Sequence, residues 1–294
     1  ADTAGNTQTT TVKSTGQFYF DNNDPTAGTV TMKLGSASGS AYTDNSWTNQ
    51  SVYVAKNNGA DGSGESGHSS TTWTIAGTAE SGTSKTLDPG SGKYATYSIV
   101  LTTKDVAGNS VSKTYTVKID KAGPSAPKIS GGSTTYATSQ KIKVSTASTD
   151  SGVGTVSYYE YYKASNSTAP TASTSGTKVT TSDNSVTFSS NIAGHYVYFR
   201  AVDGVGNAGA WSSAARVYVD VNDPTVSAKN SSVTITAGDN VAMSSYFTTS
   251  ANGNAAISST VYKIGSASYT NTSSLSAGTY TVTCTVTKVG GKTA

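Results

Sequence analysis

Apolar and polar residues alternate along much of this chain with a period of two, which predicts β-strands that bury one face. The clearest runs flank short glycine-containing segments, as Tyr196–Val202 and Val217–Asp220 flank the segment between them. Alternating runs on both sides of a glycine turn predict a β-hairpin. The pattern therefore predicts an all-β chain built from recurring hairpins.

The turn in these hairpins has a recurring sequence, Asp-x-x-Gly-Asn, which we call the turn motif. It occurs at Asp2–Asn6, Asp105–Asn109 and Asp203–Asn207, and in an altered form at Lys288–Lys292. Glycine is expected where the turn needs a positive φ, and Asp and Asn side chains can bond back to the turn's own backbone. The expected structural turn residues are Asp2, Asn6, Asp105, Asn109, Asp203 and Asn207.

The spacing of the motif predicts the domain organisation. Its copies are about a hundred residues apart, which suits independent β-sandwich domains and is too long for solenoid repeats. We expect residues 1–21 to be the last strand of a preceding or donated domain. Complete domains are expected at 22–120 and 121–220, and a domain without its last strand at 221–294.

Alternation also predicts individual strands, near 29–34, 51–55, 71–75, 94–103, 110–119, 141–144, 156–162, 186–188, 196–202, 214–219, 233–235, 256–264 and 279–288. The glycine-rich stretches 57–70 and 77–93 are expected to be loops. Tyr196 and Tyr280 each follow a glycine at the start of a penultimate strand. This placement predicts a tyrosine corner and favours an immunoglobulin-like sandwich.

The composition of the chain argues against several classes of function. Charge is sparse, the net charge of +3 is spread without runs, and no apolar run is long enough for a spanning helix, so neither nucleic acid nor membrane binding is expected. The two histidines, His68 and His195, lie far apart with no nucleophile or metal pattern around them, and we expect no enzyme. The lone Cys284 lies in an alternating run and is expected to face the core.

Several segments carry a resemblance to a known family. The segments 39–49, Trp73–Ile75, Asp105–Asn109 and Val117–Asp120 resemble the bacterial immunoglobulin-like repeats of large Gram-positive surface and adhesin proteins. The segments 158–162, 168–171 and 198–203 are similar to a neighbouring repeat type, and 225–294 resemble a shorter module. The resemblance implies tandem immunoglobulin-like β-sandwich domains in a linear array. It also implies a secreted, extracellular location at the bacterial cell surface, with neighbouring domains as partners, and it brings no catalytic residue.

Two of the expected linkers are rich in oxygen-bearing side chains. The segments Asp21–Pro25 and Asp220–Pro224 predict a candidate Ca²⁺ site at domain junctions, because Ca²⁺ takes six to eight hard oxygen ligands. The candidate ligands are Asp21, Asp24, Asp220, Asn222 and Asp223. Asx turns before proline explain the same residues without a metal. No other cofactor is expected.

Aromatic residues offer an alternative function. Trp47 and Trp211, with the chain's eighteen tyrosines, are candidates for stacking on a surface glycan or contacting a host protein, although the repeat pattern favours core packing for Trp47 and Trp73. Lys33, Lys141, Lys143 and Lys263 lie on expected strands where stalk domains carry Lys–Asn isopeptide bonds, but the sequence pairs them with no Asn.

The expected function is therefore a structural, non-enzymatic stalk or fibre segment. Because residues 7–20 read as a spare strand and 221–294 as a domain lacking one, copies of the chain are candidates for head-to-tail strand complementation. The simpler interpretation is a stretch of a longer chain. A glycan- or host-ligand-binding adhesin module is the alternative function.

Overall fold

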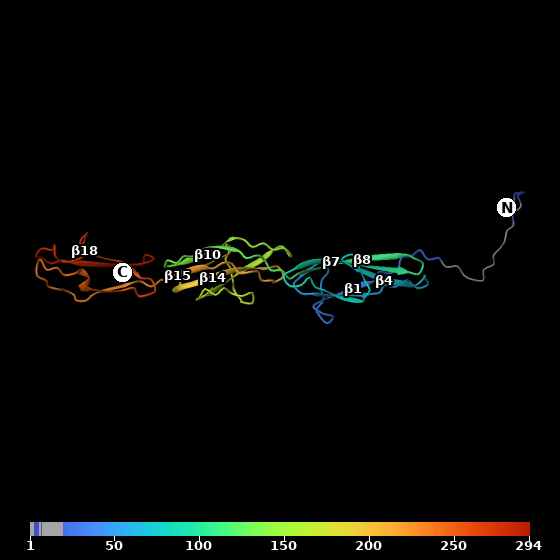
Figure 1. Ribbon diagram of the computed structural model, residues 1–294, viewed down its shortest axis with the longest axis horizontal. Coiled ribbons are helices and arrows are strands. Elements are labelled where there is room, and N and C mark those ends of the chain that lie inside the picture. Colours follow the sequence, from blue (N-terminus) through green and yellow to red (C-terminus); the bar gives the residue numbers. More distant parts are fainter. Residues whose placement is uncertain (1–2, 6, 8–19) are drawn as a thin grey trace. The chain divides into compact units, whose positions relative to one another are not determined.

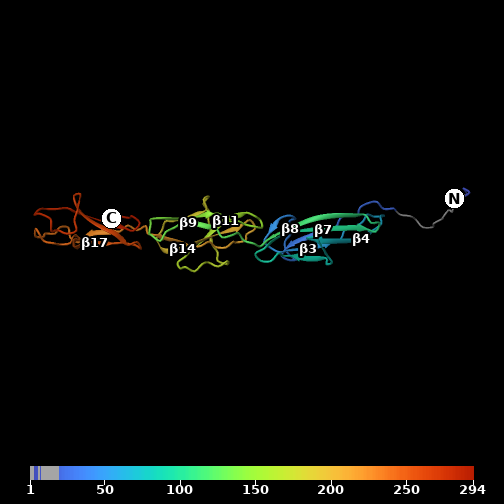
Figure 2. The same ribbon diagram turned by 45° about the horizontal axis from the view of Figure 1, so that its top comes forward.

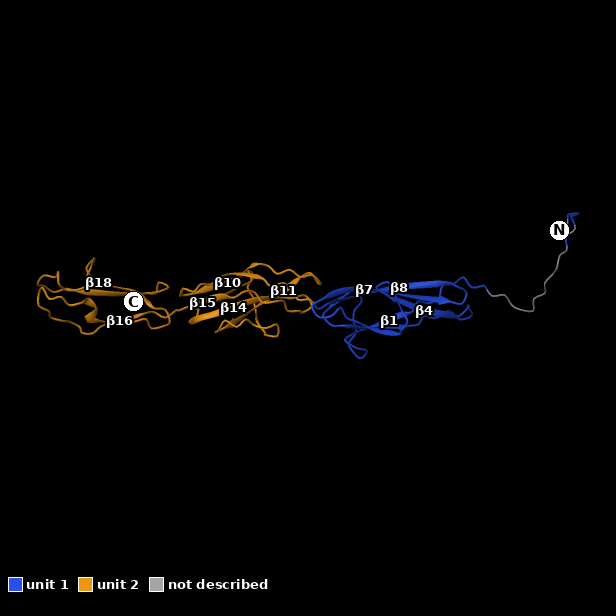
Figure 3. Cartoon of the chain, in the orientation of Figure 1, with its two compact units in different colours: residues 1–121 blue, residues 122–294 orange. Residues whose placement is uncertain are grey.

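The fold is taken from a computed structural model that describes residues 3–5, 7 and 20–294. The chain divides into two compact units, residues 1–121 and 122–294, shown in different colours in Figure 3. All regular elements of the described residues are β-strands, apart from one 3₁₀ turn, η1 (Met243–Tyr246). The expected all-β class is confirmed.

The first unit holds a sandwich of two sheets. One sheet has the order β1-β3-β6 and the other β2-β8-β7-β4-β5. The strands are β1 (Thr29–Leu34), β2 (Trp47–Thr48), β3 (Val52–Asn57), β4 (His68–Ile75), β5 (Thr78–Glu80), β6 (Ser84–Leu87), β7 (Tyr94–Asp105) and β8 (Ser110–Asp120). Figures 1 and 2 both show β7 and β8 side by side, and the two strands pair along eleven positions, Tyr94 with Asp120 through Lys104 with Ser110.

Alternation along these strands builds one core between the two sheets. Val52 and Val54 from β3 meet Ile99 and Leu101 from β7, and all four side chains are buried. Trp73 on β4 is also buried, and its Nε1 donates to the carbonyl of Gly82 at 3.0 Å. A buried tryptophan on the third main strand is a hallmark of immunoglobulin-like sandwiches.

The second unit begins with a sandwich of the same order. Its sheets are β9-β10-β13 and β12-β11-β14-β15, which match β1-β3-β6 and β5-β4-β7-β8 strand for strand. The strands are β9 (Lys128–Gly131), β10 (Gln140–Thr146), β11 (Val156–Ala164), β12 (Thr177–Lys178), β13 (Ser185–Phe188), β14 (Ile192–Asp203) and β15 (Ala215–Val219). The two sandwiches are thus internal repeats by topology.

The remainder of the second unit repeats part of this order. β16 pairs with β17, and β19-β18-β20 form a second sheet. The strands are β16 (Thr225–Ala228), β17 (Phe247–Ser250), β18 (Ile257–Ile264), β19 (Ala267–Ser268) and β20 (Val282–Lys288). In the other two repeats the strand that corresponds to β20 has a further neighbour, β8 beside β7 and β15 beside β14. Beside β20, the described residues show an isolated bridge between Thr287 and Thr293. For reference, we call the segments that carry these three sets of strands the first (22–120), second (121–220) and third (221–294) domains; the expected division into three domains stays a prediction.

Two expectations about elements were wrong. Val233–Ile235 is not a strand, and its apolar residues Val233 and Ile235 are exposed. The stretches expected to be loops also contain strands: 57–70 includes the first residues of β4, and 77–93 includes all of β5 and all of β6. Short strands whose outward residues are Ser, Thr and Lys give little apolar alternation, so β6 is recognisable only by its pairing with β3.

Candidate functional site

The turn motif has the same backbone in all three domains. The first residue donates its N–H to the carbonyl of the fifth: Asp105 to Asn109 at 3.1 Å, Asp203 to Asn207 at 3.1 Å and Lys288 to Lys292 at 2.8 Å. The fourth residue is a glycine with positive φ in every copy, at Gly5 (85°), Gly108 (103°), Gly206 (93°) and Gly291 (90°). This conformation explains the recurring glycine. Asp2 and Asn6 of the first copy lie outside the described residues.

In the first domain the Asp side chain holds the turn together. Asp105 is 3% exposed, and its Oδ1 accepts the N–H groups of Gly108 at 2.6 Å and Asn109 at 2.8 Å. Its Oδ2 accepts the side-chain Nδ2 of Asn109 at 2.8 Å. The motif's acid therefore replaces water as the acceptor for the orphan N–H groups of the turn.

The second domain repeats these contacts. Asp203 Oδ1 accepts the N–H groups of Val205 at 2.9 Å and Asn207 at 2.8 Å, and its Oδ2 accepts Asn207 Nδ2 at 2.7 Å. In both domains the side chains of these Asp and Asn residues are hydrogen-bonded within their own turn.

The fifth residue also reaches the linker before each domain. Asn109 Nδ2 donates to the carbonyl of Asp21 at 3.1 Å, and Asn207 Nδ2 donates to that of Ala122 at 3.3 Å. Each linker then ends in a buried proline, Pro25, Pro124 or Pro224. The motif thus ties a turn to a linker 88 residues earlier in the first domain and 85 residues earlier in the second.

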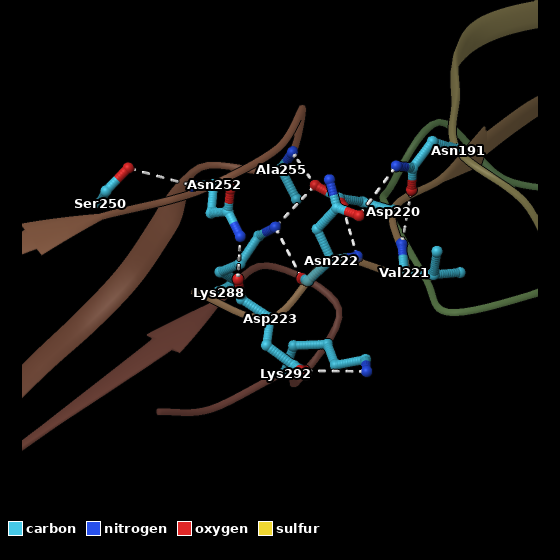
Figure 4. Close-up of polar contacts among 10 residues, drawn as sticks. All are labelled: Asn191, Asp220, Val221, Asn222, Asp223, Ser250, Asn252, Ala255, Lys288 and Lys292. Carbon is cyan, nitrogen blue, oxygen red and sulfur yellow. Dashed lines mark hydrogen bonds and ion pairs between the residues drawn. The ribbon is translucent and has the colours of Figure 1, made fainter. Parts of the chain in front are cut away.

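The third domain makes the same link with different chemistry (Figure 4). The Nζ of Lys288 donates to Asp220 Oδ2 at 2.7 Å and to the carbonyl of Asn222 at 3.0 Å. Both charged side chains of the pair are 1% exposed. The Asp220 carboxylate also accepts the N–H groups of Ala255 at 2.6 Å and Asn222 at 3.0 Å.

Weaker polar contacts surround this buried pair, as Figure 4 also shows. Lys292 Nζ lies 2.9 Å from Asp223 Oδ1, with both side chains partly exposed. Asn252 Nδ2 donates to the carbonyl of Asp223 at 3.1 Å, and Asn191 Oδ1 accepts the N–H of Val221 at 2.8 Å. The linker is therefore bonded both to the second domain, through Asn191, and to the third.

Two opposing effects set the pKa of Asp220. Burial by itself raises it, but the Lys288 ammonium and the N–H groups of Ala255 and Asn222 outweigh burial and hold the pKa below its ordinary value. The carboxylate is therefore ionised in the folded protein at neutral pH.

The predicted cation ligands divide between two settings. Asp220, Asn222 and Asp223 are engaged as described above, with the Lys288 ammonium against Asp220 and Asn222. Asp21 has a different neighbourhood, because its carboxylate comes within 4.8 Å of those of Asp61 and Asp105. Asp24, the other predicted ligand in that linker, is exposed.

This three-carboxylate cluster is an arrangement that fits a divalent cation. Among the described contacts, Asp61 Oδ1 is buried and accepts no hydrogen bond, while Asp61 Oδ2 accepts the N–H of Gly67 at 2.7 Å. Asp21 accepts the N–H of Ser66 at 2.8 Å, and this bond holds the pKa of Asp21 below its usual range. Hard, ionised oxygens are the ligands that Ca²⁺ prefers.

Sequence reasoning missed Lys288 and Asp61. A signal for Lys288 existed, since the altered motif carries Lys at two positions and the preceding linker carries Asp220 and Asp223. Asp61 gave no signal, because a single acid in a glycine-rich loop is an ordinary solvated residue.

The candidate glycan-stacking residues belong to different compact units. Trp47 is half-buried on β2, with the Lys118 ammonium 5.9 Å from its ring centroid. The Nε1 of Trp211 donates to the carbonyl of Thr171 at 3.0 Å, and the Arg200 guanidinium lies over its ring at 4.4 Å. Trp211 therefore anchors the loop that follows β11.

That loop borders a hollow of about 430 Å³. The hollow is lined by residues of the end of β11 and of the loop itself, including Tyr162, Asn166 and Thr171. The ring of Tyr162 lies 6.2 Å from that of Trp211. An aromatic ring beside hydroxyl and amide groups is a suitable lining for a sugar.

The tyrosine-corner prediction is confirmed at one of its two positions. Tyr280 OH donates to the carbonyl of Ser276 at 3.0 Å, four residues upstream, as in a tyrosine corner. It was wrong at Tyr196, whose OH accepts Arg216 at 2.7 Å from the neighbouring strand β15. Cys284 is half-buried, and burial raises the pKa of its thiol.

Comparison of the sequence with family models and with curated proteins gives no match. Among solved structures, the chain is similar to the fibronectin(III)-like modules of Clostridium thermocellum CbhA, with 10% identity, coverage of 65% of this chain and 94% of that one, and a TM-score of 0.31. It is also similar to chicken CNTN1 domains FN1–FN3, with 12% identity, coverage of 85% and 92%, and a TM-score of 0.28.

A third similar structure is SGBP-B of the Bacteroides ovatus mixed-linkage glucan utilization locus, in complex with a mixed-linkage heptasaccharide. It has 17% identity, coverage of 93% of this chain and 67% of that one, and a TM-score of 0.20. Because these superpositions are loose, the fold assignment rests on the strand order of this chain. The described residues contain no helix with the length and hydrophobicity that a membrane crossing needs.

Proposed function

We propose that this chain is a structural, non-enzymatic stalk or fibre segment of a secreted or cell-surface bacterial protein, with its immunoglobulin-like domains in a linear array. One observation carries the proposal: in each domain the turn motif ties a hairpin to the linker before it. A repeated fastening of each linker to the domain that follows it leaves less free chain at each junction, which supports a stalk. A Gram-positive adhesin is the parent protein that best agrees with the resemblance in its sequence.

Small-angle scattering tests this proposal on the whole chain. A stalk segment gives a single elongated species whose maximum dimension changes little with ionic strength. Free articulation at the linkers gives a broad distribution of dimensions instead, and that result contradicts the proposal.

A finer form of the proposal concerns assembly. After the altered turn motif at Lys288–Lys292 the chain runs back beside β20. There Val286 and Ala294 exchange both backbone hydrogen bonds, at 2.9 and 3.0 Å. We propose that residues 7–20 of a second copy extend this ladder, as β8 and β15 do beside β7 and β14. Residues 8–19 lie outside the described part of the chain.

Mass photometry at rising protein concentration tests strand donation between copies. Donation gives head-to-tail oligomers that a Phe18→Asp, Phe20→Asp double variant abolishes, because the donated strand then carries charge toward the core. Oligomers that persist in the double variant contradict donation, and so does a chain that stays monomeric at all concentrations.

We propose Ca²⁺ as the occupant of the Asp21–Asp61–Asp105 cluster in the first domain. Three mutually close carboxylates repel one another, and a divalent cation removes this cost. The buried Asp61 Oδ1 without a described donor supports this assignment. Its test is argued at the scale of the whole molecule below.

The second candidate function is binding of a glycan or host ligand by the second domain. The hollow beside Tyr162 favours it, because it offers an aromatic ring together with polar side chains. Isothermal titration with oligosaccharides tests it: binding lost in Asn166→Ala but kept in the distant Asn191→Ala supports a site in the hollow. No heat with any oligosaccharide, or equal loss in both variants, contradicts it.

A further inference from the structure

The first residue of the turn motif occupies the same structural position in all three domains. The closing backbone bond and the positive-φ glycine coincide for Asp105, Asp203 and Lys288. The linker residue four positions before the buried proline is an Asp in all three domains, namely Asp21, Asp120 and Asp220. Lys288 and Asp220 of the third domain therefore correspond to Asp105 and Asp21 of the first.

The balance of charge differs between these corresponding places. In the first domain three carboxylates, those of Asp21, Asp61 and Asp105, gather within 4.8 Å. In the third domain the motif's acid is replaced by Lys288, whose Nζ lies among oxygens of the linker: the Asp220 carboxylate and the carbonyl of Asn222. A positive charge surrounded by linker oxygens is the arrangement that a bound cation would create.

The third domain is also shaped for this pair. Gly253 lies so close to Asp220 that an added Cβ would come 2.5 Å from Asp220 Oδ2, so the loop after β17 approaches the carboxylate with backbone alone. Asp61 occupies the loop after β3, the corresponding strand in the first domain. The third domain has therefore exchanged an acid in this loop for a close N–H donor, that of Ala255.

We propose that the Lys288 ammonium takes the place of a bound cation at the base of the third domain and fastens this domain to its linker without a metal ion. Lys288 is thus a positioning residue for the linker. The inference concerns the third domain alone, so it holds or fails independently of whether the chain is a stalk.

Cys284 provides a local reporter for the test. It is the chain's one cysteine, it lies on β20 four residues before Lys288, and it is half-buried. The rate at which a thiol reagent labels Cys284 in the intact chain therefore measures opening of the third domain and of no other.

Three variants test whether the Lys288 ammonium holds the linker and whether it takes the place of a cation. Lys288→Met leaves a buried carboxylate unpaired and is expected to raise the labelling rate about 100-fold. Lys292→Met is the matched control, because its ion pair in the same turn is partly exposed, and it is expected to change the rate less than about 3-fold. Lys288→Asp restores the residue type of the other domains and is expected to make labelling fast without metal and at least about 10-fold slower with millimolar Ca²⁺.

The wild-type labelling rate is expected to be unchanged by Ca²⁺ or by a chelator. Two results overturn the proposal: a Lys288→Met rate equal to that of Lys292→Met, or a Lys288→Asp rate that Ca²⁺ does not slow. The Lys288→Asp test is informative even if this variant unfolds the third domain. A cation that fits the position would refold the domain and slow the labelling of Cys284.

Discussion

One side chain at the start of the turn motif determines how each domain holds its linker. Where it is Asp, as in Asp105, the carboxylate accepts three N–H donors of its own turn, and Asn109 makes the contact with the linker. Where it is Lys288, the long side chain crosses to the linker itself. The backbone of the turn stays the same, so the exchange changes the chemistry of the junction without changing the hairpin.

Asp105→Ala is expected to destabilise the first domain by about 2–4 kcal/mol, because three N–H donors of the turn lose a buried, charged acceptor. Hydrogen exchange of peptides from β7 and β8 measures the change. Asp88→Ala is the control, since Asp88 pairs with Lys121 at a solvent-exposed site and its loss is expected to leave the exchange nearly unchanged. Equal exchange in the two variants would contradict the structural role of Asp105.

Acid is expected to loosen the third domain through Asp220. The folded-state pKa of this carboxylate lies below its ordinary value, so its stabilisation is present above the ordinary Asp pKa, about 3.9, and is lost as pH falls through the folded pKa. The nearby charged groups are Lys288, Asp223 and Lys292. Hydrogen exchange of β20, corrected for intrinsic rates, follows the transition.

Lys288→Met is the informative comparison for this acid transition. Without the ammonium, burial dominates and raises the pKa of Asp220, so the loss of protection is expected to begin at a higher pH. An unchanged midpoint would show that another group controls the acid transition.

At the scale of elements, the pairing of strand β14 with β15 contains a β-bulge. Its register with β15 shifts between Ala193 and His195, and Gly194 in the bulge has φ +81°. The ring of Tyr218 on β15 lies over this glycine, 2.7 Å from where a Cβ would stand. The same ring packs edge-on against Tyr136 at 5.3 Å. The bulge therefore makes room for an aromatic contact that two ideal strands would exclude.

Gly194→Ala is expected to destabilise the second domain by more than about 2 kcal/mol, from backbone strain together with the clash against Tyr218. Gly154→Ala is the matched control: its φ is +75° but its Cβ would meet nothing within 4 Å, so only the conformational cost of about 1 kcal/mol applies. Urea unfolding followed by hydrogen exchange of β14 and β15 compares them. A Gly194→Ala cost no larger than that of Gly154→Ala would show that Tyr218 moves aside freely.

At the scale of the whole molecule, one chain carries junctions of two chemical kinds. The cluster of Asp21, Asp61 and Asp105 contains only acidic side chains. The junction of Asp220 with Lys288 instead pairs an acidic side chain with a basic one. Conditions that act on cations should therefore affect the first domain and spare the third.

Millimolar Ca²⁺ is expected to raise the thermal stability of the first domain and to slow hydrogen exchange in the loop 57–67. At a concentration 100 times the dissociation constant the gain is about 2.7 kcal/mol. Asp61→Asn is expected to remove the effect, while Asp183→Asn, at an exposed acid paired with Lys141, is expected to leave it intact. A Ca²⁺ response that survives Asp61→Asn would place the ion elsewhere.

The sequence by itself determined the local features. Period-two alternation predicted ten strands of the first two domains, because which face a residue takes along a strand is a local property. The glycine of the turn motif and its Asp and Asn were identifiable for the same reason: a positive φ and bonds within five residues leave a short-range signature.

Only the tertiary structure decided which distant residues meet. Lys288 and Asp220 are 68 positions apart, and alternation alone gives no reason to join them. Tyr196 satisfies the local pattern of a tyrosine corner, yet Arg216 from the next strand bonds its hydroxyl. Val233–Ile235 alternates correctly but lacks a neighbouring strand, and a strand is stable only when its hydrogen bonds have a partner.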